Sequence, residues 1–512
     1  MFRVGEAGNH TNDAGLDLCT LNTTHGACMK PKSLDVDQQS PDHVAPVVDR
    51  RSFIRGSLAG AAAISFSALL ARRAGAVELP YSDDYGPVSP VNDLTTGLPL
   101  ISLPAGFTYR SFGWRGQPMA DGRVTPGAHD GMDVVAAKAN QIALVRNHEQ
   151  GSGLLGTGNT PNTFVAAAGY ENKYGRGGTT NLLFDAVTGK WQSSYGSLSG
   201  TVTNCAGGRT PWGSWLTCEE TGFTSLDGVR HGWIFEVPGY GLATGQPLTA
   251  MGRFSHEACA VDPATGVVYE TEDATPGGFY KFVPNQYGKL AAGGTLYALK
   301  VVGQDDFSFI RTPVSAVGTT WDVEWVQVTD VEAINGRAYS SALGRAQFAR
   351  PEGAYYDSGK IFWVCTSGGT AGQGQVFVYD PRRETLNLLF QSTGSGTGDT
   401  QCNNPDNIAV SPRGGVVVCE DGGNSIQRLR GVTQNGTTFI FAENNMNLSA
   451  ADVAQADAAL QANGALITHF PPGNYRGIEW AGACFHERWM FVNIQTPGVT
   501  FAITGPWDNG ML

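Results

Sequence analysis

The sequence predicts an all-β fold, a six-bladed β-propeller of four-stranded antiparallel blades with a short helical insertion. Runs of β-forming residues follow one another along most of the chain, and 68 glycines and 26 prolines supply turns between them. One hairpin pattern also recurs six times, and each copy is followed by further strand-like runs. Successive antiparallel sheets of this kind are typical of the radially arranged blades of a propeller.

The first 76 residues are expected to lie outside this domain. Residues 1–49 form a polar extension without a hydrophobic pattern. Residues 50–76 begin with Arg50-Arg51, continue with a weakly apolar run and end at a small-residue cleavage site, which is typical of a twin-arginine signal peptide. The apolar run is too short for a stable membrane anchor. We therefore expect the twin-arginine export machinery to deliver a single mature domain, residues 77–512, to the periplasm or the extracellular space.

The most informative hairpin spans residues 201–220 and reads TVTNCAGGRTPWGSWLTCEE. The two open ends of a hairpin lie side by side, so Asn204 and Cys205 are expected to lie next to Glu219 and Glu220. A thiol and two carboxylates at one edge could bind a metal ion. The alternative interpretation is a surface hairpin whose thiol binds nothing.

Five further segments repeat this pattern along the chain. In every copy a polar residue opens the first strand, and polar residues end the second strand 14 to 16 positions later. The opposed groups are Asp133 with Asn147, His148 and Glu149; Glu257 with Glu272 and Asp273; Glu352 with Thr366 and Ser367; Asp406 and Asn407 with Glu420 and Asp421; and Glu479 with Asn493 and Gln495. The recurrence predicts a common role for the residues at this end of each hairpin.

The remaining segments are expected to complete the blades. Outer strands are predicted within residues 179–198, 231–239, 277–302, 374–391 and 426–443. From Val77 to about Gly131 the chain is predicted to be irregular and to wrap the body, with one β-like run near residues 106–114. Ser449 to Gly464 begins with a capping box, Ser449 and Asp452, and predicts a helix that acts as a lid or a buttress.

In a propeller, the first strands line the central channel and start on one face. A ring of side chains is therefore predicted at this mouth, formed by Cys205, Glu257, Glu352, Asp406 and Glu479. A second row is predicted one strand further out, formed by Glu219, Glu220, Glu272, Asp273, Glu420 and Asp421. So many carboxylates would repel one another unless cations were bound. Oxygen ligands suit calcium, and a thiolate among carboxylates suits a transition metal such as iron. The alternative is that the acids cap turns.

The cysteines support a special role for Cys205. Nine are present, of which two precede the signal peptide, so seven belong to the mature domain. Five of them lie in β-forming runs and are predicted to be buried and inert: Cys218, Cys259, Cys365, Cys419 and Cys484. Cys205 instead lies among asparagine, alanine and glycine at the start of a strand, which favours a ligand role.

Several of these motifs resemble those of the PhoX-type alkaline phosphatases in their order along the chain and in their residues. They are TNCAGGRTPWGSWLTCEE, GRFSHEACAVDP, ETED followed by FYKFVP, ARPEGAYYD, CTSGG and PDNIAVSPRGGVVVCED, within residues 95–500. The resemblance implies a secreted six-bladed propeller that hydrolyses phosphomonoesters at a cluster of iron and calcium ions. It implies that Cys205 is the iron thiolate ligand, that Glu220, Glu272, Glu352 and Glu420 are cluster carboxylates with their neighbours as calcium ligands, and that Arg350 binds phosphate.

The charge of the chain is consistent with this chemistry. A net charge of −12 argues against a nucleic-acid partner, whereas metal ions at the mouth would reverse its sign for a small phosphate ester used in phosphate acquisition. Arg350 could donate two parallel hydrogen bonds to phosphoryl oxygens. His148 and Asn147 are predicted as further substrate donors, the alternative for His148 being a structural surface histidine.

Two other functions remain open at this point. Glu352-Gly353 and Pro405-Asp406-Asn407 also resemble metal positions of calcium-dependent propeller lactonases and esterases. A secreted, calcium-stabilised binding module without catalytic activity is the third alternative. Cys205 distinguishes these classes, because a site that holds calcium alone has no use for a thiolate. The sequence predicts no particular oligomer.

Overall fold

Six hairpins form at the positions predicted from the repeated motif. The computed structural model describes residues 84–152, 169–170, 174–308, 316–461 and 470–512, all within one unit, Ala61–Leu512. The predicted extension and signal peptide lie outside these described residues. The hairpins pair β4 (His129–Lys138) with β5 (Gln141–His148), β8 (Asn204–Arg209) with β9 (Ser214–Glu219), β11 (His256–Val261) with β12 (Val268–Glu272), β18 (Pro351–Asp357) with β19 (Lys360–Cys365), β22 (Pro405–Val410) with β23 (Val416–Glu420), and β28 (Trp480–His486) with β29 (Trp489–Ile494).

Further antiparallel strands extend each hairpin outwards, mostly where the sequence predicts them. They are β6 (Gly177–Asp185) and β7 (Lys190–Thr201); β10 (Ile234–Pro238); β13 (Phe279–Pro284) and β14 (Gly294–Val301); β20 (Gln375–Asp380) and β21 (Thr385–Gln391); β24 (Arg428–Val432) and β25 (Thr438–Asn444); and β30 (Val499–Thr504) with β3 (Thr108–Phe112). The sheet of β8, β9 and β10 has three strands, so the prediction of four strands in every blade is wrong there.

Shorter elements join or cover these sheets. A long strand, β16 (Thr320–Gln327), pairs with both β14 and β21 and so joins two blades at their outer edges. The other elements are β1 (Val88–Val91), β2 (Ile101–Pro104), β15 (Asp306–Phe307), β17 (Gln347–Phe348), β26 (Asn447–Leu448), β27 (Gly473–Asn474), the helices α3 (Ala338–Ser341) and α4 (Ala450–Gln461), and the 3-10 turns Thr249–Met251, Leu290–Ala292 and Trp507–Asn509.

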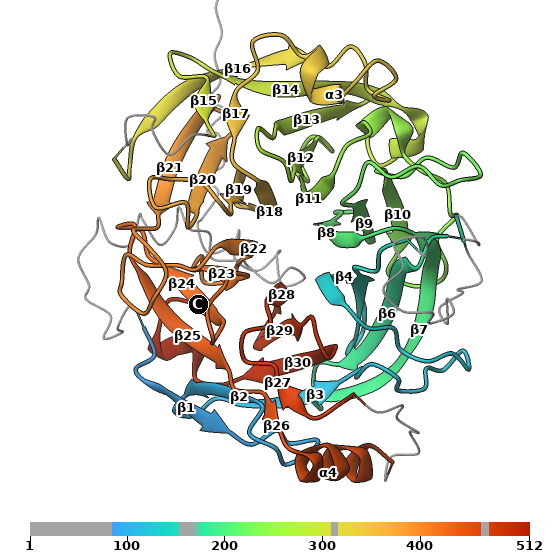
Figure 1. The fold of residues 1–512 in the computed structure, drawn as a ribbon, viewed down its shortest axis with the longest axis vertical. Helices are drawn as coiled ribbons and strands as arrows, with labels where there is room; N and C mark the ends of the chain where they lie inside the picture. The colour runs from blue at the N-terminus through green and yellow to red at the C-terminus, as the bar shows by residue number, and fades with distance from the viewer. Residues whose placement is uncertain (1–83, 153–168, 171–173, 309–315, 462–469) are drawn as a thin grey trace, which may run out of the picture. The chain divides into compact units, whose positions relative to one another are not determined.

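The first strands of the six hairpins surround a common centre. Each of β4, β8, β11, β18, β22 and β28 contacts the next, and β28 contacts β4, so that the contacts close a ring. Figure 1 shows the sheets arranged around this centre, with these strands innermost. The fold is therefore an all-β propeller, as predicted, and the predicted six blades agree with this ring.

The inner strands approach one another closely because small residues lie where they meet. A Cβ atom added to Gly131 would lie 2.4 Å from the Cα atom of Ala206 on the neighbouring strand. One added to Gly353 would lie 2.5 Å from the carbonyl oxygen of Asp406. Larger side chains at these points would push the strands apart.

The segment before β4 has a larger role than the sequence suggested. Strand β3 pairs with β30 over five residues and completes the last sheet, and β1 and β2 extend another sheet through β25. The β-like run predicted near residues 106–114 forms as β3, whereas the prediction of an irregular segment is wrong for β1 and β2. The ring is closed by hydrogen bonds between segments from the two ends of the domain, which removes two exposed edges.

Helix α4 begins at the predicted capping box. The Ser449 side chain accepts a hydrogen bond from the Asp452 amide at 3.2 Å, and the Asp452 carboxylate accepts one from the Ser449 amide at 2.8 Å. Buried Val453 and Leu460 join the largest hydrophobic cluster, and Figure 1 shows the helix at the rim beyond β26. The helix is therefore a buttress and not a lid, and the predicted end at Gly464 lies outside the described residues.

Within the part of the chain that the structure describes, no helix is both long enough and apolar enough to cross a membrane.

Tyr109 on β3 offers a test of how much the closing segment contributes to stability. Its side chain is 1 % exposed, and its hydroxyl accepts a hydrogen bond from the Leu100 amide at 2.9 Å and donates one to the Val91 carbonyl at 2.9 Å. Tyr109→Phe removes both hydrogen bonds from a buried position, so we expect a loss of about 1–3 kcal/mol in the free energy of unfolding for the two bonds together. Tyr287→Phe is the control. The Tyr287 hydroxyl also donates a hydrogen bond to a carbonyl group, that of Pro263, but its side chain is 51 % exposed. Equal unfolding curves for both variants would contradict the expectation.

Candidate metal centre

A β-bulge occurs at the same place in all six hairpins. After the first residue pair at the mouth, or after the first two in the hairpin of β28 and β29, the inner strand carries one more residue than its partner before pairing resumes. The shifts lie between His129 and Met132, Asn204 and Gly207, His256 and Cys259, Pro351 and Ala354, Pro405 and Ile408, and Ala481 and Cys484. Bulges re-aim side chains, and the first bulge residues are Asp130, Cys205, Glu257, Glu352, Asp406 and Gly482. Five of the six can therefore ligate a metal ion.

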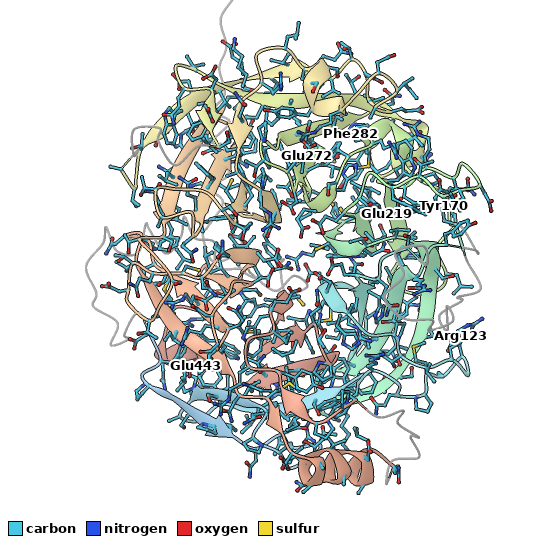
Figure 2. All side chains as sticks on the ribbon, viewed as in Figure 1. Arg123, Tyr170, Glu219, Glu272, Phe282 and Glu443 are labelled. Carbon is cyan, nitrogen blue, oxygen red and sulfur yellow. The ribbon has the colours of Figure 1, made fainter. Side chains whose placement is uncertain are left out.

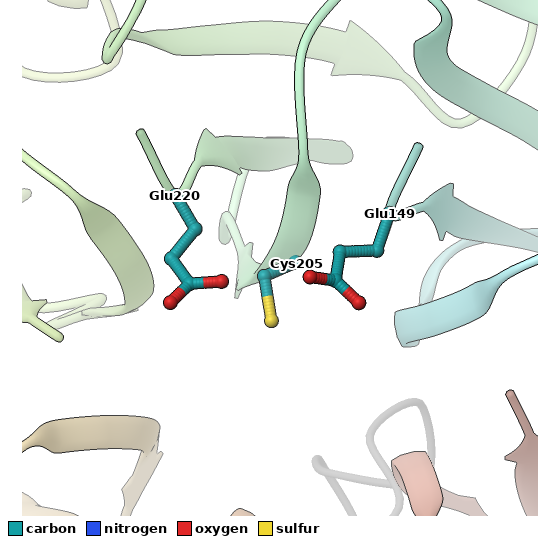
Figure 3. A group of neighbouring side chains, drawn as sticks. All are labelled: Glu149, Cys205 and Glu220. Atoms are coloured by element: carbon teal, nitrogen blue, oxygen red, sulfur yellow. The ribbon is translucent and has the colours of Figure 1, made fainter. Parts of the chain in front are cut away.

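Cys205 lies among carboxylates from neighbouring blades. Cys205, Glu149 and Glu220 each offer a ligand atom, and these atoms lie within 4.8 Å of one another. Figure 3 shows the three side chains converging, with Glu149 and Glu220 on either side of the thiol. The Cys205 thiol also donates a hydrogen bond to Glu257 Oε1 at 3.1 Å. Cys205 is thus placed at the centre of a group suited to a metal ion.

A second group lies beside the first and shares Glu149. Ligand atoms of Asp130, Glu149 and Glu479 lie within 4.8 Å of one another. The side-chain amide of Gln495 donates to Glu149 Oε2 at 2.6 Å and to Glu479 Oε1 at 2.7 Å. The buried Asp130 Oδ2 has no hydrogen-bond partner among the described residues. A carboxylate oxygen left in this state fits a site that a cation completes.

Asp130 and Glu149 were not among the ligands predicted from the sequence. Glu149 follows directly after β5 and fits the repeated spacing, so the signal was present. The repeated pattern points to Asp133 as the opening residue of that hairpin and so does not identify Asp130. Asp133 in fact pairs with Val145, lies 3.6 Å from Arg209, and lines a cavity of about 250 Å³ formed by the inner strands beyond the bulges.

The paired acids at the ends of the second strands point in opposite directions. Side chains alternate along a strand, so one residue of each doublet faces the mouth and the other faces the blade. The residues at the mouth are Glu220, Asp273 and Asp421, and those turned into the blades are Glu219, Glu272 and Glu420. Figure 2 shows Glu219 and Glu272 within their blades.

The carboxylate of Glu219 accepts hydrogen bonds from groups of its own blade and the adjoining loops. It accepts hydrogen bonds from the amides of Val202 at 2.8 Å and Gly232 at 2.8 Å, and from His231 Nδ1 at 2.6 Å. Glu219 therefore ties β9 to the loops on either side of it. The structure does not bring it into the metal-ligand group predicted from the sequence.

Glu272 and Glu420 have equivalent structural roles. Glu272 accepts from the Tyr280 hydroxyl at 2.6 Å and from Arg337 Nη2 at 2.6 Å. Glu420 accepts from Arg430 Nε at 2.5 Å within a fully buried ion pair. Both oxygens of Glu272 are bound to groups within the protein, and Glu420 Oε1 is held by Arg430, whereas the buried Glu420 Oε2 has no hydrogen-bond partner among the described residues. Neither residue belongs to the two ligand groups at the mouth.

Burial and mutual repulsion raise the pKa of the carboxyl groups at the mouth. Burial, followed by the charges of neighbouring acids, raises the pKa of Asp130, Glu220, Glu257 and Glu479 well above their usual values. The same two causes raise the pKa of Glu149 to about 7. Without cations, part of this cluster must therefore hold protons, and bound cations would remove that need.

Arg350 lies at the mouth beside two of these acids. Its Nε and Nη2 atoms each donate a hydrogen bond of 2.8 Å to the two carboxylate oxygens of Asp273, and Nη2 lies 2.6 Å from Glu352 Oε1. The side chain is 41 % exposed. A planar guanidinium that is partly exposed in this position can meet an incoming anion.

His148 and Asn147 are fully buried and do not reach the mouth. The two ring nitrogens of His148 lie 2.9 Å from the Gly127 carbonyl oxygen and 2.9 Å from Thr180 Oγ1. Burial lowers the pKa of His148 well below its usual value, so the ring is neutral. The amide of Asn147 bonds the backbone of the next blade. The structure therefore does not bring these two residues together with the groups at the mouth, which only Glu149 of this triplet joins.

Known proteins resemble the chain in sequence family and in fold. A family model described as alkaline phosphatase PhoX matches residues 83–196 and 184–498. The structure of Pseudomonas fluorescens PhoX in complex with vanadate, a transition state analogue, matches with a TM-score of 0.58 and 18 % identity, over 85 % of this chain and 99 % of that chain. A gluconolactonase from Xanthomonas campestris matches with a TM-score of 0.28 and 12 % identity, over 77 % and 98 % of the two chains, which is too low to support an inference. No curated protein sequence matches significantly.

The raised pKa values predict how the stability of the metal-free protein depends on pH. Glu149, at about 7, and Asp406, raised to about 6 chiefly by burial, hold protons in the folded state that the unfolded chain has already lost. Their contribution is complete below the unfolded values and is lost as the pH rises through the folded ones. We expect the melting temperature in chelator to fall between about pH 5 and about pH 8. Glu149→Gln should reduce this fall, whereas Glu324→Gln, at a side chain that is 60 % exposed, should not. A melting temperature that rose over this range would contradict the interpretation.

Proposed function

The chain belongs to the PhoX alkaline phosphatase family, and on this premise we propose that it hydrolyses phosphate monoesters at a cluster of iron and calcium ions in the propeller mouth. The convergence of Cys205, Glu149 and Glu220 within 4.8 Å carries the proposal. A thiol among carboxylates favours a transition metal, whereas a site for calcium alone, as in the lactonase and binding-module alternatives, has no use for it. The vanadate bound to the Pseudomonas fluorescens protein, as a transition state analogue, is consistent with phosphoryl transfer.

The residues of the mouth divide into two sets by the metals they suit. Cys205, Glu149 and Glu220 would hold iron, because the sulfur ligand is soft and the three anionic groups together would balance the charge of the metal ion. Calcium prefers many oxygen ligands, and the remaining acids offer them: Asp130, Glu257, Asp273, Glu352, Asp406, Asp421 and Glu479. When bound, these ions would neutralise the phosphoryl oxygens and the leaving group and would activate the attacking nucleophile.

The protonation of Cys205 couples metal binding to pH. Burial, followed by the charges of Asp130 and Glu257, raises the pKa of the Cys205 thiol well above its usual value. The free site therefore keeps the thiol protonated, and the ligand form requires that a cation displace the proton. This agrees with a cation-filled mouth as the working state of the protein.

Arg350 would bind the phosphoryl group of the substrate. Its fork is held in a fixed direction by Asp273 and Glu352, so little side-chain freedom is lost when an oxyanion binds. A phosphate ester would compete with Asp273 for the same donors. The carboxylate thus released could turn towards a cation, which would link substrate binding to the metal cluster.

We place this activity outside the cytoplasm. The twin-arginine signal at residues 50–76 favours export to the periplasm or beyond. Small phosphate esters would be the substrates there, and phosphate acquisition would be the role of the reaction. The exporting machinery would be the partner of the signal segment.

Substitution of Cys205 tests the proposed iron site. We expect the purified protein to contain iron and calcium, and Cys205→Ser to lose the iron, any thiolate-to-iron absorption and nearly all phosphatase activity, because a neutral hydroxyl replaces the thiolate. Visible absorption, elemental analysis and hydrolysis of an aryl phosphate are measured together. Cys365→Ser is the control, since Cys365 is fully buried at the end of β19 in a hydrophobic cluster of its blade and belongs to neither ligand group. Iron and activity retained in Cys205→Ser would refute the site.

Substitution of Arg350 tests the proposed phosphate contact. Arg350→Ala should lower turnover of an aryl phosphate roughly 100-fold, as does the loss of one transition-state donor in other enzymes, and Arg350→Lys should recover part of it. Arg337→Ala provides a matched control. Arg337 is 43 % exposed and pairs with Glu272, the neighbour of Asp273 that is turned into the blade and away from the mouth. Unchanged turnover in Arg350→Ala would exclude the contact.

A further inference from the structure

We propose that Asn147 and Thr271 are positioning residues that fix the bulges carrying Cys205 and Glu352 on the following blades. The proposal rests on the proposed function in one respect, because it takes these two bulges as part of the metal site. We call each contact a carbonyl latch, meaning a buried polar side chain that donates a hydrogen bond to the backbone oxygen of a bulge residue on the next blade.

Asn147 uses its whole hydrogen-bonding capacity in this contact. Its Nδ2 atom donates to the carbonyl oxygens of Cys205 at 2.9 Å and Ala206 at 2.7 Å, the two residues of the bulge. Its Oδ1 atom accepts from Trp215 Nε1 at 2.9 Å and from Thr217 Oγ1 at 2.8 Å. The register shift interrupts the ladder at the bulge, and the Asn147 side chain supplies a hydrogen-bond donor to both carbonyl groups there.

Thr271 makes the same contact two blades further along. Its hydroxyl donates to the carbonyl oxygen of Glu352 at 2.6 Å and accepts from the Ala258 amide at 3.0 Å. Both residues are fully buried. Asn147 and Thr271 occupy equivalent places, since each lies on the second strand opposite the bulge of its own hairpin.

The distribution of polar side chains at this place links the latch to the site. The equivalent residues of the other four hairpins are Cys218, Val364, Cys419 and Val492. An amide or hydroxyl therefore occurs only where the next bulge carries Cys205 or Glu352. Asp130 is held in a related way, because Asn493 Nδ2 donates to its carbonyl oxygen at 2.7 Å.

The latch would act on the metal ligands through the backbone. A Cys205 side chain has one rotatable bond before its sulfur atom, so the sulfur position follows the backbone position closely. Groups that orient metal ligands from behind usually change metal affinity roughly 10–100-fold when they are removed. A purely structural hydrogen bond between blades would change stability without this effect.

Variants of Asn147 separate these two roles. Asn147→Leu removes the latch, and Asn147→Thr retains one hydroxyl donor, as Thr271 has. Asn181→Leu is the matched control: Asn181 is fully buried and donates to the carbonyl oxygens of Pro238 and Gly239, at 2.9 Å each, between the same two blades but away from Cys205. The purified full-length proteins are compared for hydrogen exchange of residues 203–207 and for the rate at which a chelator removes transition metal.

Asn147→Leu should exchange faster at residues 203–207 and lose metal roughly 10–100-fold faster than the wild type. Asn147→Thr should lie between the two, and Asn181→Leu should match the wild type in both measurements even if it melts earlier. Equal behaviour of Asn147→Leu and Asn181→Leu would overturn the proposal.

A second variant and the metal content of the wild type cover the two cases in which the comparison above would not decide. If Asn147→Leu does not fold, Thr271→Val, which preserves shape, should raise exchange at residues 350–354, and no rise there would overturn the proposal. If the wild type held no transition metal and hydrolysed no phosphate ester, the proposed function would fail. The exchange measurement would still support or refute the latch.

Discussion

The close approach of six inner strands around one axis is the constraint on which the rest of the structure depends. Strands this near to one another leave room only for small residues at their contacts, as Gly131 and Gly353 show. A bulge at the mouth of every hairpin adds one residue to the inner strand, and the bulge turns one side chain towards the centre. Five acids or thiols converge as a result, so the geometry that closes the ring also builds the candidate metal site.

The buried acids of the blades and of the mouth differ in what surrounds them. Glu219, Glu272 and Glu420 accept hydrogen bonds from amide, hydroxyl, imidazole or guanidinium donors, and the guanidinium groups oppose the effect of burial, which raises the pKa of Glu272 and Glu420. At the mouth the nearest charges are other carboxylates, with Arg350 as the neighbouring cation, and their repulsion adds to the effect of burial on the pKa values. Two kinds of buried acid therefore lie one residue apart: one stabilises the blade, and the other needs a cation to be stable as an anion.

Closure of the ring by β3 gives the site its rigidity. The last sheet takes its outer strand, β3, from the start of the domain and is thereby completed. Its inner strand, β28, contacts the inner strands of the two neighbouring blades, β22 and β4. The buried hydroxyl of Tyr109 and the side chains of α4 fix this closing segment against the core. Side chains at the mouth thus project from strands that cannot separate without breaking a whole sheet, which suits a site that must hold several ions in fixed positions.

The sequence by itself determined the hairpins, their number and the end of each hairpin at which polar side chains gather, because turn residues and β-forming runs act locally. It also singled out Cys205, whose neighbours are unlike those of the buried cysteines in β-forming runs. Only the tertiary structure decided which acid of each doublet faces the mouth, because side chains alternate along a strand and the packing of the blade decides which face is turned inwards. The same holds for Asp130, displaced from the expected Asp133 by the register of β4, and for Asn147, whose partner is a backbone carbonyl 58 residues away. The pairing of β3 with β30 likewise joins segments from opposite ends of the domain, and no local pattern encodes a partner at that distance.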